Sequence, residues 1–268
     1  MSPRTVRGAT GMRMAFNPFR RNRSTGAAPA RYRLPAGLRV YAIGDVHGRF
    51  DCLLQIERAI ARDHGLRAPV EQALVIFLGD YVDRGLSSRE VLERLTQPGF
   101  AGLPARYLIG NHEDAMLRFL AEPRDTAAWL NWGGAATLAS YGIAISPTPT
   151  PAQLTAAGRA LAAALPKAHH DFLVRLELAI ELGDFAFVHA GIRPGIALNR
   201  QRRADLLEIR EPFLSSEALH PRRIVHGHTV TADPVIFANR ISIDTGAYAT
   251  GRLTAAVIED DRVDILTN

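Results

Sequence analysis

The residues best suited to chemistry in this sequence are aspartates, histidines and one asparagine, which stand in five short motifs. The motifs are GDVHG (44–48), GDYVDRG (79–85), GNHE (110–113), HAG (189–191) and GHT (227–229). Carboxylate oxygen combined with imidazole nitrogen suits Mn, Fe, Zn or Ni ions and does not suit calcium. Two such ions about 3.5–4 Å apart can hold a water and a phosphoryl oxygen together. The chemistry indicated is therefore that of a metal centre that can bring a water and a phosphoryl oxygen together.

Each motif directly follows an apolar run that predicts a buried strand. We expect strands at 38–43, 73–78 and 106–109, and helices at 50–62, from about Ser87 to Leu95, and from near Glu113. Asp45 and Asp80 are 35 positions apart, and Asp80 and Asn111 are 31 apart, which matches one strand–helix–strand step. These three side chains should therefore lie side by side along one edge of a sheet.

Charged side chains gathered at a sheet edge repel each other unless a cation joins them. A single GD or HAG motif carries little information, because a histidine at a strand end usually has a structural role. Five such motifs in this order, all after apolar runs, predict a metal centre.

The rest of the chain consists of a helical segment followed by a second group of strands. Residues 121–175 are Ala-rich and predict a helical insertion with a break at 146–151. Residues 176–181 and 185–188 predict a hairpin. Five further strands are expected at 223–225, 234–237, 241–243, 252–258 and 262–266.

The composition, with 47% hydrophobic and 22% charged residues among 268, is that of an ordinary globular protein with one large domain or one domain carrying an insertion. Residues 1–39 hold nine arginines and no acidic residue, so we expect residues 1–36 to be a basic, disordered extension. Contact of this arm with nucleic acid stays open. The single cysteine, Cys52, favours a reducing compartment and a cytoplasmic location, and no apolar window is long enough for a membrane span.

At these motifs the sequence resembles the calcineurin-like metallophosphoesterases, and most closely their phosphoprotein phosphatase branch, whose signature is GDxHG…GDxxDRG…GNHE. The resemblance covers residues 40–265 approximately. It implies an α/β fold, a four-layer α-β-β-α sandwich in which residues 121–175 form a small helical cap. It also implies two divalent metal ions, Mn²⁺ in the first place with Fe or Zn as alternatives.

The resemblance assigns roles to the motif residues. It implies these metal ligands: Asp45 and His47 for the first ion, Asp80 bridging both, and Asn111, His189 and His228 for the second. His226, on the other side of Gly227, is expected next to the ligands and not among them.

The resemblance further makes His112 the general acid that protonates the leaving group, with Asp83 orienting its ring and Arg84 binding the phosphate. Asn111 would also contact the substrate. Arg210 matches the second phosphate-binding arginine of this branch, with Arg193 and Arg203 as competitors for that role. Tyr248 either approaches the substrate or packs beside a turn.

Several functions are compatible with this resemblance. The first is a bacterial-type Ser/Thr phosphoprotein phosphatase, favoured by Asp83 and Glu113. The second is a symmetrically cleaving bis(5'-nucleosyl)-tetraphosphatase, which also acts as an RNA cap pyrophosphohydrolase; its members commonly lack that aspartate and carry GNHD. Small phosphomonoesters are a third substrate class. A non-catalytic scaffold should lack a ligand or His112, and none is missing.

Two residues narrow the choice further. Val230 stands where nucleases and cyclic-nucleotide phosphodiesterases of the wider group carry another metal-binding histidine, which argues against those activities. The tryptophans of the cap, Trp129 and Trp132, form either an aromatic wall for the substrate or, as the simpler interpretation, the packing of the cap onto the core.

Overall fold

The computed structural model describes residues 32–268. The predicted basic extension lies outside the described residues except for positions 32–36, and its suggested contact with nucleic acid lies outside them too. Tyr32 and Leu34 are buried, and the Tyr32 hydroxyl donates a hydrogen bond of 2.7 Å to the backbone carbonyl of His220. No helix within residues 32–268 combines the length and the apolar character that crossing a bilayer requires.

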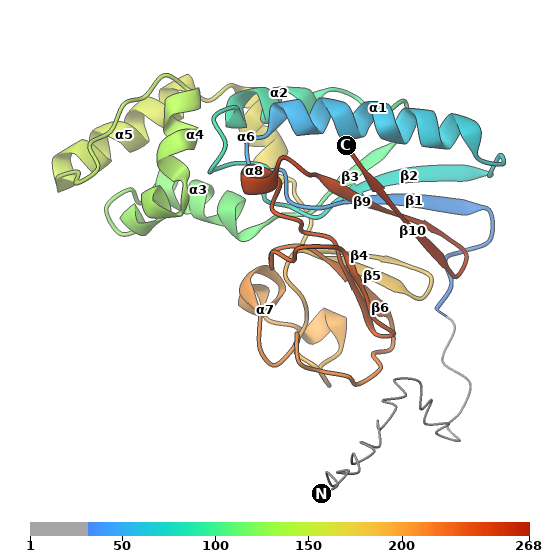
Figure 1. Ribbon diagram of the computed structural model, residues 1–268. Helices are drawn as coiled ribbons and strands as arrows, with labels where there is room; N and C mark the ends of the chain where they lie inside the picture. The colour runs from blue at the N-terminus through green and yellow to red at the C-terminus, as the bar shows by residue number, and fades with distance from the viewer. Residues whose placement is uncertain (1–31) are drawn as a thin grey trace, which may run out of the picture. The chain divides into compact units, whose positions relative to one another are not determined.

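The first sheet has five strands in the order β10–β9–β1–β2–β3 (Figure 1). Their bounds are β1 Leu38–Ile43, β2 Gln72–Phe77, β3 Ala105–Tyr107, β9 Thr254–Glu259 and β10 Arg262–Thr267. Strands β1, β2 and β3 run parallel, and β9 and β10 are antiparallel additions. The predicted strands form because their apolar runs are buried on both faces, as a central parallel sheet requires.

Helices α1 (Phe50–Leu66) and α2 (Ser88–Thr96) cover one face of this sheet (Figure 1). The buried stripe of α1 consists of Cys52, Leu53, Ile56 and Ile60, at the spacing of one helix face. It belongs to the same core cluster as the strand residues Tyr41 and Val75. Cys52 is thus a buried core residue.

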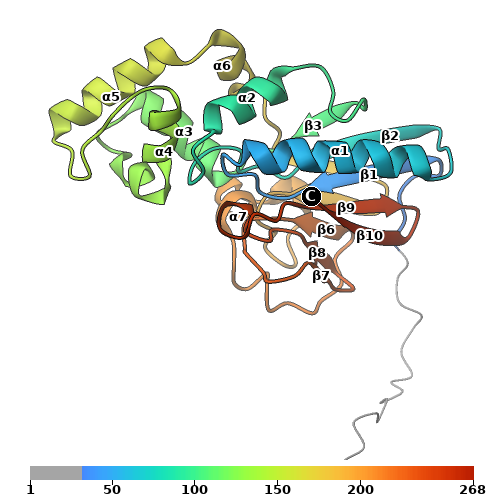
Figure 2. The ribbon, with the colours of Figure 1, turned by 45° about the horizontal axis from the view of Figure 1, so that its top comes forward.

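The second sheet has the order β4–β5–β6–β8–β7. Its bounds are β4 Ala179–Leu182, β5 Phe185–Val188, β6 Arg223–His226, β7 Val235–Ile236 and β8 Arg240–Ser242. It packs against the first sheet through one apolar layer, in which Val40 and Ile76 of the first sheet meet Phe187, Val225 and Ile241 of the second. Figure 2 shows the two sheets stacked below α1.

The far face of the second sheet is covered by α7 (Arg203–Glu208) and the segment that follows it. Leu206, Ile209 and Phe213 pack there against Val188 and Ile224. Helices, two sheets and a further helical layer confirm the predicted α-β-β-α sandwich.

The chain segment that follows β3 and precedes β4 is helical. It is built from α3 (Asn111–Ala121), the 3₁₀ helix η1 (Ala127–Trp132), α4 (Gly134–Ser140), α5 (Pro151–Ala164) and α6 (Lys167–Val174). Figure 2 shows α3, α4 and α5 projecting beyond the sheets on one side. The predicted break at 146–151 precedes α5, where the Thr150 hydroxyl accepts the Gln153 N–H as an N-cap.

Several boundaries differ from the predictions by one to four residues, and two of these differences have a clear structural cause. Helix α3 begins at Asn111, two residues before Glu113, because the Glu113 carboxylate accepts the N–H of Gly110 at 2.9 Å and so closes the first turn early. Strand β4 begins at Ala179, because Glu177 pairs instead with Leu108 of the first sheet.

Candidate active site

The carboxyl ends of β1, β2 and β3 bring the first three predicted residues together. Asp45 follows β1, Asp80 follows β2, and Asn111 opens the helix after β3. The backbone N–H of His112 donates to Oδ1 of Asp80 at 3.2 Å, which ties the second and third motifs together. The predicted alignment along one sheet edge is therefore confirmed, since parallel neighbouring strands end at the same edge.

The second sheet delivers two histidines to the same place. His189 follows β5, and His228 lies just beyond the parallel neighbour β6. The backbone N–H of His228 donates to both carboxylate oxygens of Asp45, at 3.0 and 3.2 Å, which joins the two sheets at the site. Gly227 is required there, because a Cβ atom would lie 2.0 Å from Oδ1 of Asp45.

Two imidazoles are oriented by backbone carbonyls. Nδ1 of His47 lies 2.9 Å from the carbonyl of Val82, and Nδ1 of His189 lies 2.8 Å from that of Leu78. Each ring therefore donates from Nδ1, which leaves a lone pair on Nε2. Each Nε2 lies 3.4 Å from a carboxylate oxygen of Asp80. Burial lowers the pKa of His47 to about 3, so this ring is a neutral acceptor facing another acceptor.

The amide oxygen of Asn111 also faces the ring nitrogens of two histidines. Its Oδ1 lies 3.0 Å from Nε2 of His189 and 3.0 Å from Nδ1 of His228. Two triplets of donors lie close enough to hold an ion each: His47, Asp80 and His112, and Asp80, His189 and His228. Both contain Asp80, and their oxygen and nitrogen donors suit two divalent transition-metal ions that share one carboxylate.

Asp45 lies outside both triplets but is part of the same buried cluster. Burial, followed by the charges of Asp244 and Asp80, raises its pKa well above the usual range. Although burial alone would raise it, the imidazoles of His189 and His112 hold the pKa of Asp80 below its usual range. This crowding of buried carboxylates is the arrangement that bound cations stabilise.

His112 and Asp83 form a close pair beside the donors. Nδ1 of His112 lies 2.7 Å from Oδ2 of Asp83, and both side chains are buried. Burial opposes protonation of His112, but the carboxylates of Asp80 and Asp83 outweigh it and raise the pKa to about 9. Nη2 of Arg84 lies 3.4 Å from the other ring nitrogen, Nε2. Asp83 thus holds the ring at Nδ1, and Nε2 is the nitrogen that faces Arg84 and, at 3.8 Å, Oδ2 of Asp80.

Arg84 and Tyr248 lie together at the mouth of the site. The guanidinium carbon of Arg84 lies 4.4 Å from the centre of the Tyr248 ring, a cation–π contact. The same ring meets His47 edge-on at 5.4 Å. Tyr248 is 38% exposed and contacts two predicted site residues, Arg84 and His47, and its contact with substrate stays a prediction.

Arg210 lies close enough to His228 that its charge helps to lower the pKa of that histidine, after burial and His189. It is exposed and forms no ion pair with any residue in 32–268. The two competing arginines are engaged: Arg193 pairs with Asp205, and Arg203 pairs with Asp114, each at 2.8 Å.

Backbone strain is concentrated in the site. Seven non-glycine residues within the described range have positive φ, and five of them are predicted site residues: His47, Asp80, Asp83, Arg84 and His228. Side chains other than glycine seldom adopt this conformation, and such strain persists only where the surrounding contacts over-determine it.

Three buried residues that the sequence predictions did not assign also shape the site. Glu113 accepts four backbone N–H groups, those of Asp80, Tyr81, Val82 and Gly110. Asp244, in the DTG segment, accepts the N–H of Gly246 and lies beside Asp45. Trp129 contacts Asp83 through its indole nitrogen. The E of GNHE and the aspartate of DTG were visible signals, whereas the tryptophan contact depends on tertiary folding.

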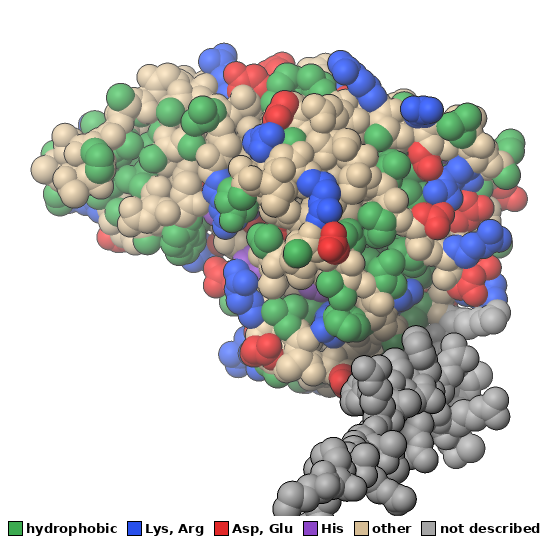
Figure 3. Space-filling model, viewed as in Figure 1, with side chains coloured by type: hydrophobic (Ala, Val, Ile, Leu, Met, Phe, Trp, Pro, Cys, Tyr) green, Lys and Arg blue, Asp and Glu red, His purple; other side chains and the backbone are tan. Residues whose placement is uncertain are grey.

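His226, predicted to lie beside the ligands, is buried against Phe213 with ring centroids 5.0 Å apart and belongs to neither donor triplet. Figure 3 shows histidine side chains in the hollow between the projecting helices and the part formed by the second sheet.

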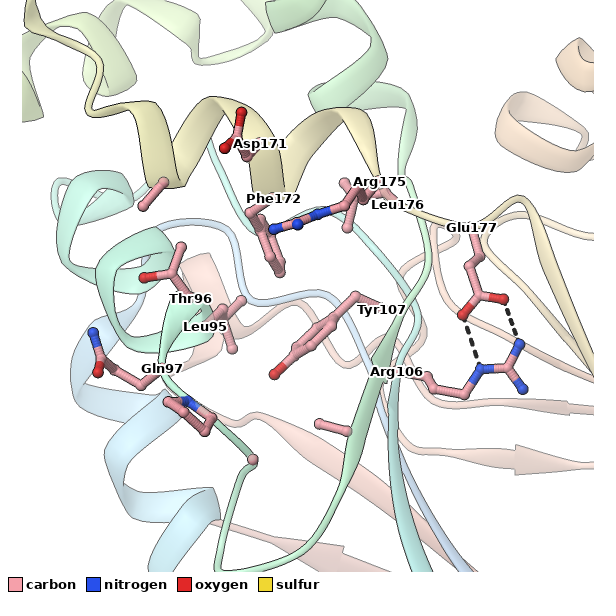
Figure 4. Close-up of a pocket in the computed structure, with 14 residues that line it drawn as sticks. Leu95, Thr96, Gln97, Arg106, Tyr107, Asp171, Phe172, Arg175, Leu176 and Glu177 are labelled. Atoms are coloured by element: carbon pink, nitrogen blue, oxygen red, sulfur yellow. Dashed lines mark hydrogen bonds and ion pairs between the residues drawn. The ribbon is translucent and has the colours of Figure 1, made fainter.

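A pocket of about 500 Å³ lies away from the predicted site residues (Figure 4). It is formed by the end of α2, strand β3 and helix α6, and Arg106 and Glu177 form an ion pair at its edge. None of the predicted site residues lines it, so its size does not make it the site of the chemistry.

Comparisons with known proteins agree with this geometry. Residues 38–265 match the family model described as calcineurin-like phosphoesterase. The chain is 28% identical over 228 residues to serine/threonine-protein phosphatase 1 of Salmonella typhimurium, covering 82% of this chain and 92% of that protein. It is 26% identical over 233 residues to the asymmetrical bis(5'-nucleosyl)-tetraphosphatase of Bacillus thuringiensis, covering 80% and 87%.

Among solved structures, a proposed diadenosine tetraphosphatase superposes with a TM-score of 0.60 at 20% identity, covering 86% of this chain and 93% of that one. A cold-active protein tyrosine phosphatase superposes with a TM-score of 0.52 at 17% identity, covering 88% and 81%. These two likenesses concern the fold. The family match spans most of the chain, and the chain therefore belongs to the calcineurin-like phosphoesterases, a family of metal-dependent hydrolases with a dinuclear centre.

Proposed function

We propose that the protein is a phosphoprotein phosphatase that hydrolyses phosphoserine and phosphothreonine. One observation supports this choice of substrate most directly: the site offers two guanidinium groups, Arg84 and Arg210, that form no ion pair with a carboxylate in residues 32–268 and suit a single phosphoryl group. A phosphomonoester carries its charge on one phosphorus, whereas a tetraphosphate chain spreads more charge over a greater length.

The proposed metal ligands are those of the sequence prediction: Asp45 and His47 for the first ion, Asp80 for both, and Asn111, His189 and His228 for the second. Mn²⁺ is the proposed ion, with Fe or Zn as the alternatives that the same donors accept. When bound, two such ions lower the pKa of a water and polarise a phosphoryl oxygen.

The protein's own groups supply the rest of the proposed reaction. His112 donates the proton on Nε2 to the leaving oxygen, and Asp83 at Nδ1 keeps the ring in the orientation and tautomer that this requires. Arg84, Arg210 and Asn111 bind the oxygens of the phosphoryl group and stabilise their charge as the bond to the leaving group breaks. Tyr248 supports the Arg84 guanidinium through their cation–π contact.

Cleavage of dinucleoside tetraphosphates is the second candidate, because a relative of similar identity bears that name and is described as asymmetrical in its cleavage. The charges of the described residues disfavour it. Two further arginines near the site are neutralised, Arg49 by Asp51 and Arg193 by Asp205, and Arg203 shares the carboxylate of Asp114 with Arg118.

A pocket of about 190 Å³ beside Trp132 adds to this argument. Asp125 and Glu208 line it, are exposed, and form no ion pair with another residue in 32–268. Unpaired carboxylates beside the site repel a polyphosphate and favour peptides with basic side chains near the phosphorylated residue.

The test is the ratio of kcat/KM for a phosphoserine peptide to kcat/KM for diadenosine tetraphosphate, measured with Mn²⁺. We expect the peptide to be preferred by more than tenfold, and Arg84→Ala and Arg210→Ala each to lower its kcat/KM by about tenfold or more, since a charge-assisted hydrogen bond contributes about 1.5–3 kcal/mol. Arg193→Ala, which removes an arginine already paired with Asp205, is the matched control and should change little. A preference for the dinucleotide would contradict the proposal.

A further inference from the structure

The carboxylate of Asp83 is completely buried and receives hydrogen bonds from three side chains. Its Oδ2 accepts from Nδ1 of His112 at 2.7 Å and from the indole Nε1 of Trp129 at 2.7 Å. Its Oδ1 accepts from the hydroxyl of Thr137 at 2.6 Å. Two of the three donors therefore come from the helical insertion, and one of them shares an oxygen with His112.

The backbone of Asp83 is held by the same network. Its N–H points at the hydroxyl oxygens of Ser88, at 3.0 Å, and of Thr137, at 2.9 Å. The residue has φ +74°, a conformation that a non-glycine residue keeps only when its neighbours impose it. Thr137 thus contacts both ends of Asp83, as hydrogen-bond acceptor for the backbone and as donor to the side chain.

The two donors are linked by a turn that fits closely onto the Asp83–Arg84 turn. Gly133 lies between η1 and α4 with φ +115°, and its carbonyl accepts the N–H of Arg84 at 3.4 Å. A Cβ atom on Gly133 would lie 2.5 Å from the Arg84 nitrogen. The insertion is consequently fixed relative to the loop that carries both Asp83 and Arg84.

The Trp129 ring has no freedom to turn its N–H elsewhere. It is 1% exposed and lies 4.8 Å from the Phe119 ring, and a Cβ on Gly134 would come within 2.4 Å of it. The indole N–H therefore has a fixed direction, toward Asp83. Packing alone would be served by phenylalanine, and a buried indole needs a hydrogen-bond acceptor that a phenyl ring does not.

We infer that Trp129 and Thr137 are positioning residues for His112: they hold the Asp83 carboxylate against Nδ1 of its ring, so that the proton is presented from Nε2. A buried carboxylate keeps its place only when donors satisfy its oxygens. Loss of the indole donor leaves Oδ2 with one partner and frees the carboxylate to rotate away from the ring. The inference rests on the proposed function, in which His112 protonates the leaving group, and it makes the helical insertion part of the catalytic apparatus.

The test compares two substrates with the same phosphoryl group and different leaving groups. p-Nitrophenyl phosphate releases a weakly basic phenolate that needs little protonation, whereas phenyl phosphate releases a more basic one. Trp129→Phe removes the indole N–H and keeps an aromatic ring. General acid catalysis contributes about 10²–10⁴-fold, so we expect kcat for phenyl phosphate to fall at least about tenfold, kcat for p-nitrophenyl phosphate to fall less than about threefold, and KM to change little. Thr137→Val should show the same pattern.

Tyr141→Phe is the matched control, because it removes a buried hydrogen bond of the same insertion, 2.8 Å from the tyrosine hydroxyl to Nδ1 of His169, away from Asp83. It should leave the ratio of the two kcat values unchanged. Equal losses on both substrates in Trp129→Phe would indicate a purely structural role and overturn the inference, and so would wild-type values. Wild-type protein that hydrolyses neither of these substrates nor a phosphoserine peptide would refute the proposed function itself.

A second measurement does not depend on activity. The chain has two tryptophans, so its two indole N–H signals are readily resolved by NMR. The inference predicts slow hydrogen exchange at the Trp129 indole and fast exchange at the Trp132 indole, which is 46% exposed. Asp83→Asn should accelerate exchange at Trp129 and leave exchange at Trp132 unchanged. Equal exchange at both indoles, or no response to Asp83→Asn, would overturn it.

Discussion

The carboxylate of Glu113 lies 2.7 Å from the backbone nitrogen of Tyr81, and this contact ties the first turn of α3 to the loop after β2. The same side chain also accepts the N–H groups of Asp80, Val82 and Gly110. It is completely buried, so these four donors are its solvation. Glu113 thus fixes the backbone on both sides of Asp80, which both donor triplets share.

Glu113→Gln should therefore lower both stability and activity. The NH₂ group of the new amide would face backbone N–H groups, so that donor meets donor and no hydrogen bond forms. Each unsatisfied buried group costs about 1–3 kcal/mol. We expect the free energy of unfolding in urea to fall by about 2–4 kcal/mol. Asp171→Asn, which alters an exposed ion pair with Lys167, is the comparison and should change stability by less than about 0.5 kcal/mol. Equal effects would show that the Glu113 contacts are not structural.

Gly110→Ala should impair activity through one added methyl group. The φ of Gly110 is −95°, which alanine accepts, but a Cβ atom would lie 2.0 Å from Oδ1 of Asp80. Because a displacement of about 1 Å in a catalytic group costs about a hundredfold in rate, we expect kcat to fall by that order.

Gly65→Ala is the matched control for this substitution. No atom lies within 4 Å of the added methyl group, and the site is in helix α1, where alanine is favoured by up to about 1 kcal/mol. It should raise the melting temperature slightly and leave kcat unchanged. Normal activity in Gly110→Ala would mean that the position of Asp80 is not decisive.

Binding of Mn²⁺ should stabilise the fold, because the lone pairs and carboxylates that converge on Asp80 are poorly placed without a cation. A ligand at a hundred times its Kd adds about 2.7 kcal/mol, or about 5–10 °C in melting temperature for a chain of this size. Calorimetry should show this shift with Mn²⁺, a much smaller one with Ca²⁺, and none in Asp80→Asn. A shift that survives Asp80→Asn would place the ion elsewhere.

Truncation of Trp129 should mainly lower stability, whereas truncation of Trp132 should mainly change substrate binding. Trp129 is buried, so Trp129→Ala should cost about 3–5 kcal/mol in the free energy of unfolding. Trp132 is 46% exposed and lies 6.5 Å from His112, so Trp132→Ala should cost less than about 1 kcal/mol and should raise KM for a phosphopeptide. A Trp132→Ala protein with unchanged KM would remove this side chain from the substrate site.

The sheet edge that gathers the site could be predicted because its signals are local. Continuous apolar runs predicted β1 and β2. The motif after each strand placed Asp45 and Asp80 at the same edge of the sheet, because neighbouring parallel strands end at the same edge. The motifs HAG and GHT also identified His189 and His228 as candidates, but only the family resemblance placed them at this edge, because nothing in the spacing shows that two sheets meet there.

What the sequence could not predict depends on contacts between distant segments. The Trp129 indole reaches Asp83 across 46 positions and the Glu113 carboxylate reaches Tyr81 across 32, and neither periodicity nor composition encodes such contacts. For the tryptophans, the packing interpretation holds for Trp129, which packs the insertion onto the core, whereas Trp132 is exposed beside His112 and its contact with substrate stays a prediction.

The central claim, a metal-dependent phosphoesterase built around Asp80, is tested most directly by phenyl phosphate hydrolysis. Metal-stripped protein is assayed with and without Mn²⁺, alongside Asp80→Asn and His112→Asn. The account predicts activity that requires the metal, is lost in Asp80→Asn and is strongly reduced in His112→Asn. Folded wild-type protein that is inactive with every divalent ion tried, or an Asp80→Asn protein as active as wild type, would contradict it.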